Sequence, residues 1–552
     1  MSSLSSGQLN AISASAIVSL SSAAINQLHS EQIAGLSTSA LQALKTNQIA
    51  AISASAIVGL GTDAIGTLQT FQIASLSTAQ LSNLTSAQVD ALNGADIKAL
   101  STNQVVNGLS SAGIKALTSS QVAQLGTADL NALNTAEVQA LGSAGIGQLT
   151  SSQVQSLTST ALNALTTSQL ATLSVNLLTS AQVSGLSTGQ LAGLSATQVQ
   201  QLNSADLRAL STSQLVNGLG TAGIASLTST QVQSLTTTAL NALSTAQLAT
   251  LAIASLTTGQ VAGLSTGQLS SLISSQVQQL GSADIKALST SQVVNGLGSA
   301  GIKALTSSQV AQLGTADLNA LNTAEVQALG SAGIGQLTSS QVQSLTSTAL
   351  NALTTSQLAT LSVNLLTSAQ VSGLSTGQLA ALSTTQVQQL NSADLKALNS
   401  SQLAAGLGTT GIASLSSTQV QALSTATLNS LSTAQLATLA IASLTTGQVA
   451  GLSTAQLSSL GSSQLQNLTT AEAKSLSSSQ VGSLSTAGLA GLSSSALQSL
   501  TTSQISGLTS SQLANGLTTS QLNSLTSTQV NALTSAQVAG LSSDQLQALH
   551  VH

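Results

Sequence analysis

Apolar residues recur along this chain at two positions in every eight. One series of aliphatic residues advances by eight, from Leu4 to Leu100, and a second follows five residues behind each member, from Leu9 to Val105. The same alternation of five and three residues returns as far as Leu549. Because an internal period of this kind decides the fold of a repeat protein, we interpret nearly the whole chain as an octapeptide repeat.

A period of eight excludes one long regular element. On a continuous α-helix, with about 100° per residue, the apolar pair would rotate by roughly 80° in each repeat, so no side of the helix would stay buried. On a strand, spacings of five and three place successive aliphatic residues on opposite faces, which suits a β-solenoid buried on both sides. The spacing alone leaves a solenoid of helices and a β-solenoid open.

The polar residues between the aliphatic positions favour helices. The position after the second aliphatic residue holds Ser, Thr, Asn or Gly, as at Ser101, Asn134 and Thr150, and these are preferred N-cap residues. Three positions later stands a residue such as Gln104 or Glu137, which completes a capping box. We therefore predict an all-α fold, a solenoid of very short helices of about five to seven residues, one per octapeptide. The β-solenoid with polar corners is the alternative.

Such short helices need neighbours to be stable. Nucleating a helix costs more free energy than two turns of hydrogen bonds return, so each repeat must bury its aliphatic pair against adjacent copies. We expect Leu81, Leu84 and Val89 to be buried, and the capping glutamines Gln80 and Gln88 to lie near the surface.

Departures from eight residues recur in phase. Nine-residue repeats end at Leu109, Leu219, Leu297, Leu407 and Leu517, and five-residue repeats end at Leu178, Leu256, Leu366 and Leu444. Residues 111–192 are duplicated identically as residues 299–380. We predict a single continuous array over residues 1–552, with regular octads in 1–100, higher-order repeats in 101–517, and regular octads with a C-terminal tail in 518–552. The odd repeats are interpreted as corners or register corrections.

Charged residues are scarce, and some of them recur in phase with the nine-residue repeats. The chain has 8 Lys and Arg against 13 Asp and Glu, a net charge of −5, and so offers no basic face to nucleic acid. An acidic residue three positions after the expected N-cap and a basic residue five positions after it occur together at Asp96 and Lys98, Asp206 and Arg208, Asp284 and Lys286, and Asp394 and Lys396. They are typical of a solvated face matched to the helix dipole. A charge ladder between stacked coils is the alternative.

Candidate catalytic chemistry is sparse. The sequence has no cysteine, and its histidines are His29, His550 and His552, so its many hydroxyls have few possible general bases. Gly-x-Gly-x-x-Gly occurs at residues 218–223, 296–301 and 406–411, but a dinucleotide site also requires a preceding strand and a long following helix. We expect no enzyme, no catalytic or metal-binding residue, no cofactor and no small-molecule substrate.

Two resemblances bear on function. The segment LSTNQVVNGL, residues 100–109, resembles the first helix of bacterial TAL effector repeats, but the chain lacks their long period and their basic surface. The whole chain is more similar to low-complexity bacterial surface or secreted proteins built of Leu-(Ser/Thr)-x-x-Gln octapeptide repeats. That resemblance implies a surface location without implying an activity or a site residue.

We therefore predict an extracellular structural protein, a rod-like solenoid that self-assembles head to tail into filaments or a surface layer, with itself as partner. Its first and last coils would expose complementary aliphatic faces. The N-terminus shows no recognisable cleaved signal, and no apolar run approaches 18 residues, so we expect neither a signal peptide nor membrane insertion. The alternative is a binding module whose rows of Ser and Thr hydroxyls face ice or polysaccharide.

Overall fold

Short helices make up all the regular structure of the part of the chain that the computed structural model describes, residues 3–549. Four consecutive ones are α8 (Thr70–Ile73), α9 (Thr78–Leu81), α10 (Ser86–Asp90) and α11 (Gly94–Ala99). The predicted all-α solenoid of short helices is confirmed. The β-solenoid alternative is wrong, because no strand occurs between residues 3 and 549.

Local hydrogen bonds start and stop each helix after one or two turns. At α9, the Ser77 hydroxyl accepts a hydrogen bond from the Gln80 backbone N–H, and the Gln80 side chain accepts one from the Ser77 N–H. At the other end, the N–H of Leu84 donates to the Leu81 carbonyl at 3.1 Å. The next cap, Thr85, is extended (φ −70°, ψ 158°), so the chain turns there and a new helix begins.

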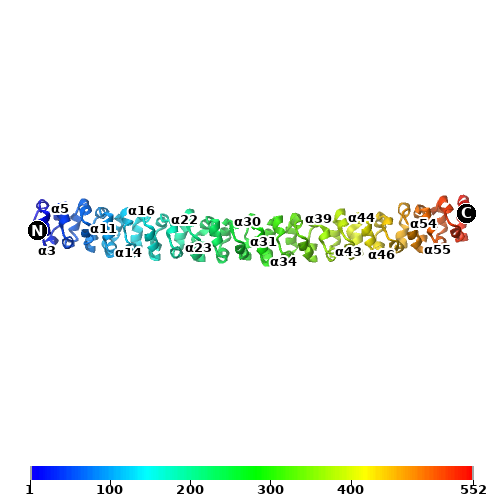
Figure 1. Ribbon diagram of the computed structural model, residues 1–552, viewed down its shortest axis with the longest axis horizontal. Coiled ribbons are helices and arrows are strands. Elements are labelled where there is room, and N and C mark those ends of the chain that lie inside the picture. Colours follow the sequence, from blue (N-terminus) through cyan, green and yellow to red (C-terminus); the bar gives the residue numbers. More distant parts are fainter. Residues whose placement is uncertain (1–2, 550–552) are drawn as a thin grey trace. The chain divides into compact units, whose positions relative to one another are not determined.

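The chain divides into two compact units, residues 1–272 and residues 273–552. Within each unit, the helices follow one another in chain order along the unit, which Figure 1 shows in its change of colour. Each unit is described by itself below.

Most helices pack against the third helix after them, counting the 3₁₀- and π-helices. In unit 1, α1 (Ser6–Asn10) contacts α4 (Ser30–Ala34), and in unit 2, α51 (Thr470–Ser475) contacts α54 (Ser494–Ser499). Hydrogen bonds of the capping glutamines reach one repeat further: Gln80 donates to the Ile52 carbonyl, 28 residues earlier. One coil of the solenoid therefore contains between three and four repeats.

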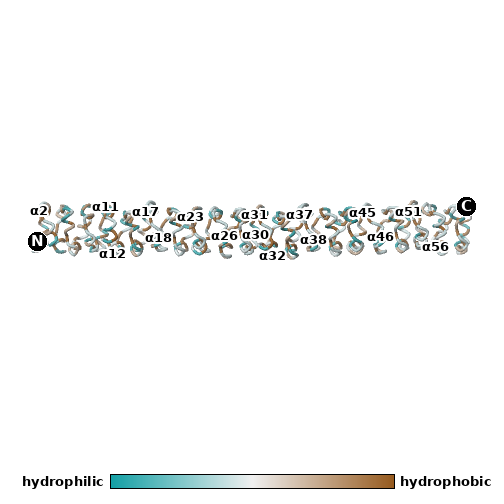
Figure 2. Tube along the Cα trace, turned by 90° about the horizontal axis from the view of Figure 1, so that it is seen from below, coloured by the Kyte–Doolittle hydropathy of each residue, from teal (hydrophilic) through white to brown (hydrophobic). Residues whose placement is uncertain are grey.

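The aliphatic pair of each repeat forms the core. Leu81, Leu84 and Val89 have exposed fractions of 1%, 9% and 0%, which confirms their predicted burial. Figure 2 shows the consequence in each unit, where apolar and polar segments alternate along every coil. No helix in residues 3–549 is long and apolar enough to span a membrane.

The odd-sized repeats are accommodated by a change of helix type. Four nine-residue repeats contain π-helices, which hold one residue more per turn: η2 (Gln104–Gly108), η4 (Gln214–Gly218), η6 (Gln292–Leu297) and η8 (Gln402–Leu407). The fifth lies in α56 (Ser510–Gly516), an α-helix. The five-residue repeats form 3₁₀-helices η3 (Val175–Leu177), η5 (Ile253–Ser255), η7 (Val363–Leu365) and η9 (Ile441–Ser443).

Each odd repeat still fills one place in its coil. The glutamine-to-leucine hydrogen bond spans 28 residues from Gln88 to Leu60 across octads, 29 from Gln121 to Leu92 across a nine-residue repeat, and 25 from Gln182 to Leu157 across a five-residue repeat. The difference in chain length is thus absorbed inside the odd repeat, and the stacking register continues beyond it.

Candidate functional site

The most repeated chemical feature of the molecule is a glutamine that joins one coil to the coil before it. Gln80 uses its Oε1 to accept from the Ser77 N–H at 2.8 Å, and its Nε2 donates to the carbonyls of Ile49 and Ile52, both at 2.8 Å. In unit 2, Gln504 likewise accepts from Thr501 and donates to Ala473 and Leu476. We call this side chain a clamp glutamine.

The expectation that the capping glutamines lie near the surface is wrong. Gln80 and Gln88 have exposed fractions of 1% and 3%. Their amides donate to carbonyls of the preceding coil, including those of Ile52 and Leu60, which stacking would otherwise bury without a donor, and this explains why they lie inside. Sequence reasoning identified the cap, for which a glutamate serves equally well, but not the second partner, which requires an N–H donor.

Three of the four phased aspartates are buried rather than solvated, and the fourth, Asp284, is half-buried. Asp96, Asp206 and Asp394 have exposed fractions of 0%, 0% and 1%. Each carboxylate accepts a hydroxyl hydrogen bond from the preceding coil, from Thr70 at 2.9 Å, Ser180 at 2.7 Å and Ser368 at 2.7 Å. Burial raises the pKa of Asp96, against the lowering effect of the hydrogen bonds from Thr70 and Asn93.

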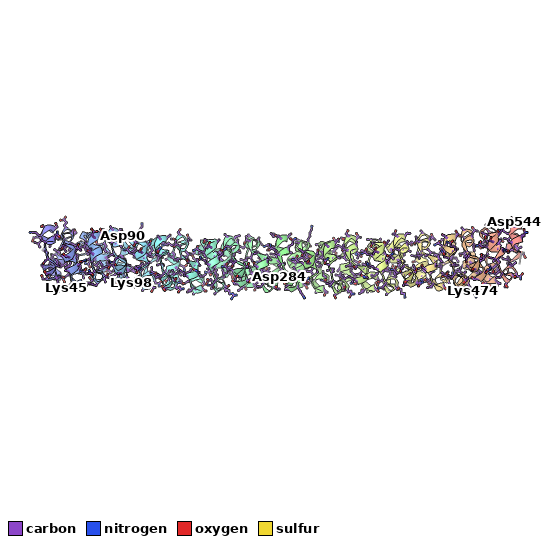
Figure 3. All side chains as sticks on the ribbon, turned by 45° about the horizontal axis from the view of Figure 1, so that its top comes forward. Lys45, Asp90, Lys98, Asp284, Lys474 and Asp544 are labelled. Atoms are coloured by element: carbon purple, nitrogen blue, oxygen red, sulfur yellow. The ribbon has the colours of Figure 1, made fainter. Side chains whose placement is uncertain are left out.

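The solvated-face interpretation is therefore wrong for these three aspartates. It is right for lysines such as Lys98, which is exposed and lies at the surface with Lys45 and Lys474 (Figure 3). The charge ladder is not formed at these aspartates either, because their partner in the neighbouring coil is a hydroxyl group.

The Gly-x-Gly-x-x-Gly segments are explained by packing and backbone conformation. A Cβ on Gly218 would lie 3.0 Å from the Leu191 side chain, and one on Gly223 would lie 2.8 Å from the Leu219 Cβ. Between them, Gly220 has φ +62°, a conformation that favours glycine. The segment follows the π-helix η4 rather than a strand, so it lacks the geometry of a dinucleotide loop.

Of the candidate general bases, His29 lies far from His550 and His552 in the sequence. His29 is exposed before α4, whereas His550 and His552 lie outside the described residues. Between residues 3 and 549, no group of three or more His, Cys, Asp or Glu side chains could hold a metal ion.

A small apolar cavity of about 10 Å³ lies in unit 1. It is lined by Leu130, Val138, Leu141, Ile146 and neighbouring aliphatic side chains. This volume is at the lower limit for a single water molecule, and the walls offer no polar partner, so the cavity is a packing defect.

Comparisons with known proteins identify the repeat. The ALTTAQ repeat family matches residues 1–38, 90–127, 122–159, 199–237, 277–315, 310–347, 387–425 and 515–551, together more than half of the chain. A search of curated proteins finds no match. Among solved structures, the chain is similar to one titled "Homology model of the full-length AP-3 complex in an intermediate open conformation", with 11% identity over 95% of this chain and 79% of that chain. The TM-score of 0.13 is below that of a shared fold. The family matches establish that this repeat protein belongs to the ALTTAQ repeat family.

Proposed function

We propose that the chain is an extracellular structural protein that self-assembles head to tail into filaments or a surface layer. The main observation in support of this proposal is that the same coil-to-coil interface recurs along the chain. The same clamp joins Gln80 to Ile49 and Ile52 in unit 1 and Gln504 to Ala473 and Leu476 in unit 2.

Interchangeable coils favour association between molecules. When no other coil covers one face of a coil, that face exposes aliphatic side chains and carbonyls that lack the donor of a clamp glutamine. The opposite face of another coil carries that donor and matching aliphatic side chains, so the two faces are complementary. A contact between two different faces of the same molecule propagates into an open filament when its rotation does not close. The low net charge of −5 adds little repulsion between copies.

Electron microscopy and light scattering of the purified chain test this proposal. The native protein should form particles that lengthen with concentration, and their hydrophobic contacts should survive high salt. A variant with a charged capping helix appended to the C-terminus should remain shorter. Equal assembly of the capped and native proteins, or a native protein that stays monomeric at high concentration, would overturn the head-to-tail proposal. Monomers that bind ice or polysaccharide would favour the Ser/Thr binding module instead.

The extracellular part of the proposal is supported by the resemblance to bacterial surface repeat proteins. Labelling of intact cells with a membrane-impermeant amine reagent tests it, because lysines such as Lys45 and Lys98 are exposed. Labelling only after lysis would contradict an external location.

A further inference from the structure

Two buried glutamates stand where equivalent repeats carry clamp glutamines. The fourth repeat after a nine-residue repeat holds a glutamine in three of five cases, and its Nε2 donates to a carbonyl 31 residues earlier: Gln247 to Val216, Gln435 to Ala404 and Gln545 to Ala514. The other two cases hold Glu137 and Glu325. The two glutamates therefore stand where the other three cases have a glutamine Nε2 that donates to the preceding coil.

Both glutamates keep the cap and lack the bond to the preceding coil. Glu137 lies in α15 (Thr135–Ala140), is 5% exposed, and accepts from the Asn134 N–H at 2.9 Å. Glu325 in α35 (Thr323–Ala328) is 4% exposed and accepts from the Asn322 N–H at 2.9 Å. Neither of these described side chains hydrogen-bonds to the coil before it.

Protonation would supply the missing donor. Glutamate has the shape of glutamine, but an ionised carboxylate only accepts hydrogen bonds, whereas the protonated acid has one O–H to donate. We propose that Glu137 and Glu325 are proton-controlled clamps, which close their coil junctions by donating to the carbonyls of Val106 and Val294 when protonated and open them when ionised. These carbonyls lie 31 residues earlier, in the place of the Val216 carbonyl that accepts from Gln247.

The repeats on either side of the glutamates also lack a clamp glutamine, and the coil-to-coil hydrogen bond beside each glutamate comes from a hydroxyl group, Thr102 or Thr290. Around Glu137, the equivalent positions hold Asp129 and Gly145, and around Glu325 they hold Asp317 and Gly333, so three successive repeats lack a clamp glutamine. The cavity of about 10 Å³ in unit 1 lies between these three repeats, which contribute Leu130, Val138 and Ile146, and later repeats, which contribute Leu157, Ala161 and Leu165.

The charged groups near the glutamates are few. Against α15 pack α12 (Ser110–Ala116), whose one charged residue is the exposed Lys115, and α18 (Ser159–Ala164), which has none. Against α35 pack α32 (Gly298–Ala304), with exposed Lys303, and α38 (Ser347–Ala352), again with none. The preceding helices add Asp129 and Asp317, which accept hydroxyl hydrogen bonds from Thr102 and Thr290.

Hydrogen–deuterium exchange of the full chain, followed by mass spectrometry, tests the proposal. Protection factors of residues 134–141 and 322–329 are compared with those of residues 244–251 and 432–439 in the same sample, at about pH 3 and about pH 7. At the acidic pH, residues 134–141 and 322–329 should have protection factors similar to those of residues 244–251 and 432–439. At neutral pH, their protection factors should be about tenfold lower than those of the glutamine-containing segments, which corresponds to the loss of one hydrogen bond. A constant ratio at the two pH values would overturn the proposal.

Two double variants distinguish a pH-dependent hydrogen bond from a low local stability that does not depend on pH. Because residues 111–192 and 299–380 are identical and yield shared peptides, E137Q and E325Q are combined. This variant should restore the protection of the Gln junctions and remove the pH dependence. The reverse pair, Q247E with Q435E, should transfer the pH dependence to residues 244–251 and 432–439. Persistence of the pH dependence in E137Q/E325Q, or its absence from Q247E/Q435E, would contradict the assignment.

Discussion

At the scale of the residue, a single side chain has two separable tasks. The Oε1 of a clamp glutamine caps its own helix, and the Nε2 ties that helix to an earlier coil, as in Gln80. An aspartate in the same position caps its helix but must find a donor, and Asp96 finds it in the Thr70 hydroxyl. The residue type at this position therefore decides how two coils are joined, whereas the cap itself tolerates Gln, Glu and Asp.

Replacing Gln80 with Glu should weaken its coil junction at neutral pH. The cap to Ser77 is kept, but the donors to Ile49 and Ile52 are lost and their buried carbonyls are left without that partner. We expect a loss of about 1–3 kcal/mol in local stability, measured by hydrogen exchange of residues 45–52 and 77–84. Gln8→Glu is the matched control, because Gln8 hydrogen-bonds only to its own cap residue, Ser5. Equal effects of the two changes would contradict the clamp.

Ser110→Gly should stabilise the chain locally. Ser110 is the one non-glycine residue with positive φ (+58°) among residues 3–549, and Gly220, Gly298 and Gly408 occupy the equivalent place with φ between +56° and +64°. Relief of this conformation is worth about 1–2 kcal/mol. Gly220→Ser should lower stability by a similar amount. Local hydrogen exchange around each position measures both changes, and a destabilising S110G would refute the strain.

Asp96 should make local stability fall as pH rises. Burial raises the pKa of this carboxyl in the folded chain, so the folded state binds its proton more tightly than the unfolded state does. Its contribution is fully present below the unfolded pKa and is lost as pH rises through the folded pKa. Hydrogen-exchange protection near residues 93–100 across the acidic range should show this slope, and Asp96→Asn should remove it. Asp90→Asn at an exposed site is the control; a slope unchanged in D96N would exclude Asp96 as its source.

At the scale of the element, no helix is long enough to be stable alone. Helix α9 has 4 residues and α15 has 6, so each depends on its caps and on the aliphatic pair it buries. The odd repeats show that the coil tolerates changes in length when the helix type changes with them. One added residue gives the π-helix η2, and a shortened repeat gives the 3₁₀-helix η3.

Truncating an aliphatic side chain should therefore cost as much here as in a globular core. Leu81→Ala and Leu84→Ala, at positions 1% and 9% exposed, should each lower local stability by about 2–5 kcal/mol, through lost burial and the cavity left behind. Ser86→Ala, at an exposed position of the next helix, should change it by less than about 0.5 kcal/mol. Native-state hydrogen exchange measures all three, and a Leu84→Ala effect as small as that of Ser86→Ala would contradict the core.

At the scale of the whole molecule, stability is the sum of junctions between neighbouring coils. Helices contact mainly the third helix onward and glutamine clamps reach the fourth repeat back, so the interactions in the described part of each unit join neighbouring coils. The proposed proton-controlled clamps at Glu137 and Glu325 would place one weaker junction in each unit.

Unfolding should accordingly be local and stepwise. In a linear array, repeats unfold without the rest, so urea transitions followed by far-UV circular dichroism and by hydrogen exchange should not coincide. The dependence of the free energy on urea should also be shallower than a single cooperative transition of 552 residues would give. Coincident transitions with the steep slope of such a transition would contradict the additive array.

The sequence by itself determined the local structure. The five-and-three aliphatic spacing and the capping boxes are read within one repeat, and they sufficed to predict short helices, their N-caps and the burial of Leu81 and Val89, although α9 has four residues instead of the expected five to seven. Only the tertiary structure decided the number of repeats in a coil, because that number depends on how successive turns rotate, which no single repeat encodes. It also decided that Gln80 and Asp96 are buried, since their second partners lie 28 and 26 residues earlier in the chain and become neighbours only when the coils stack.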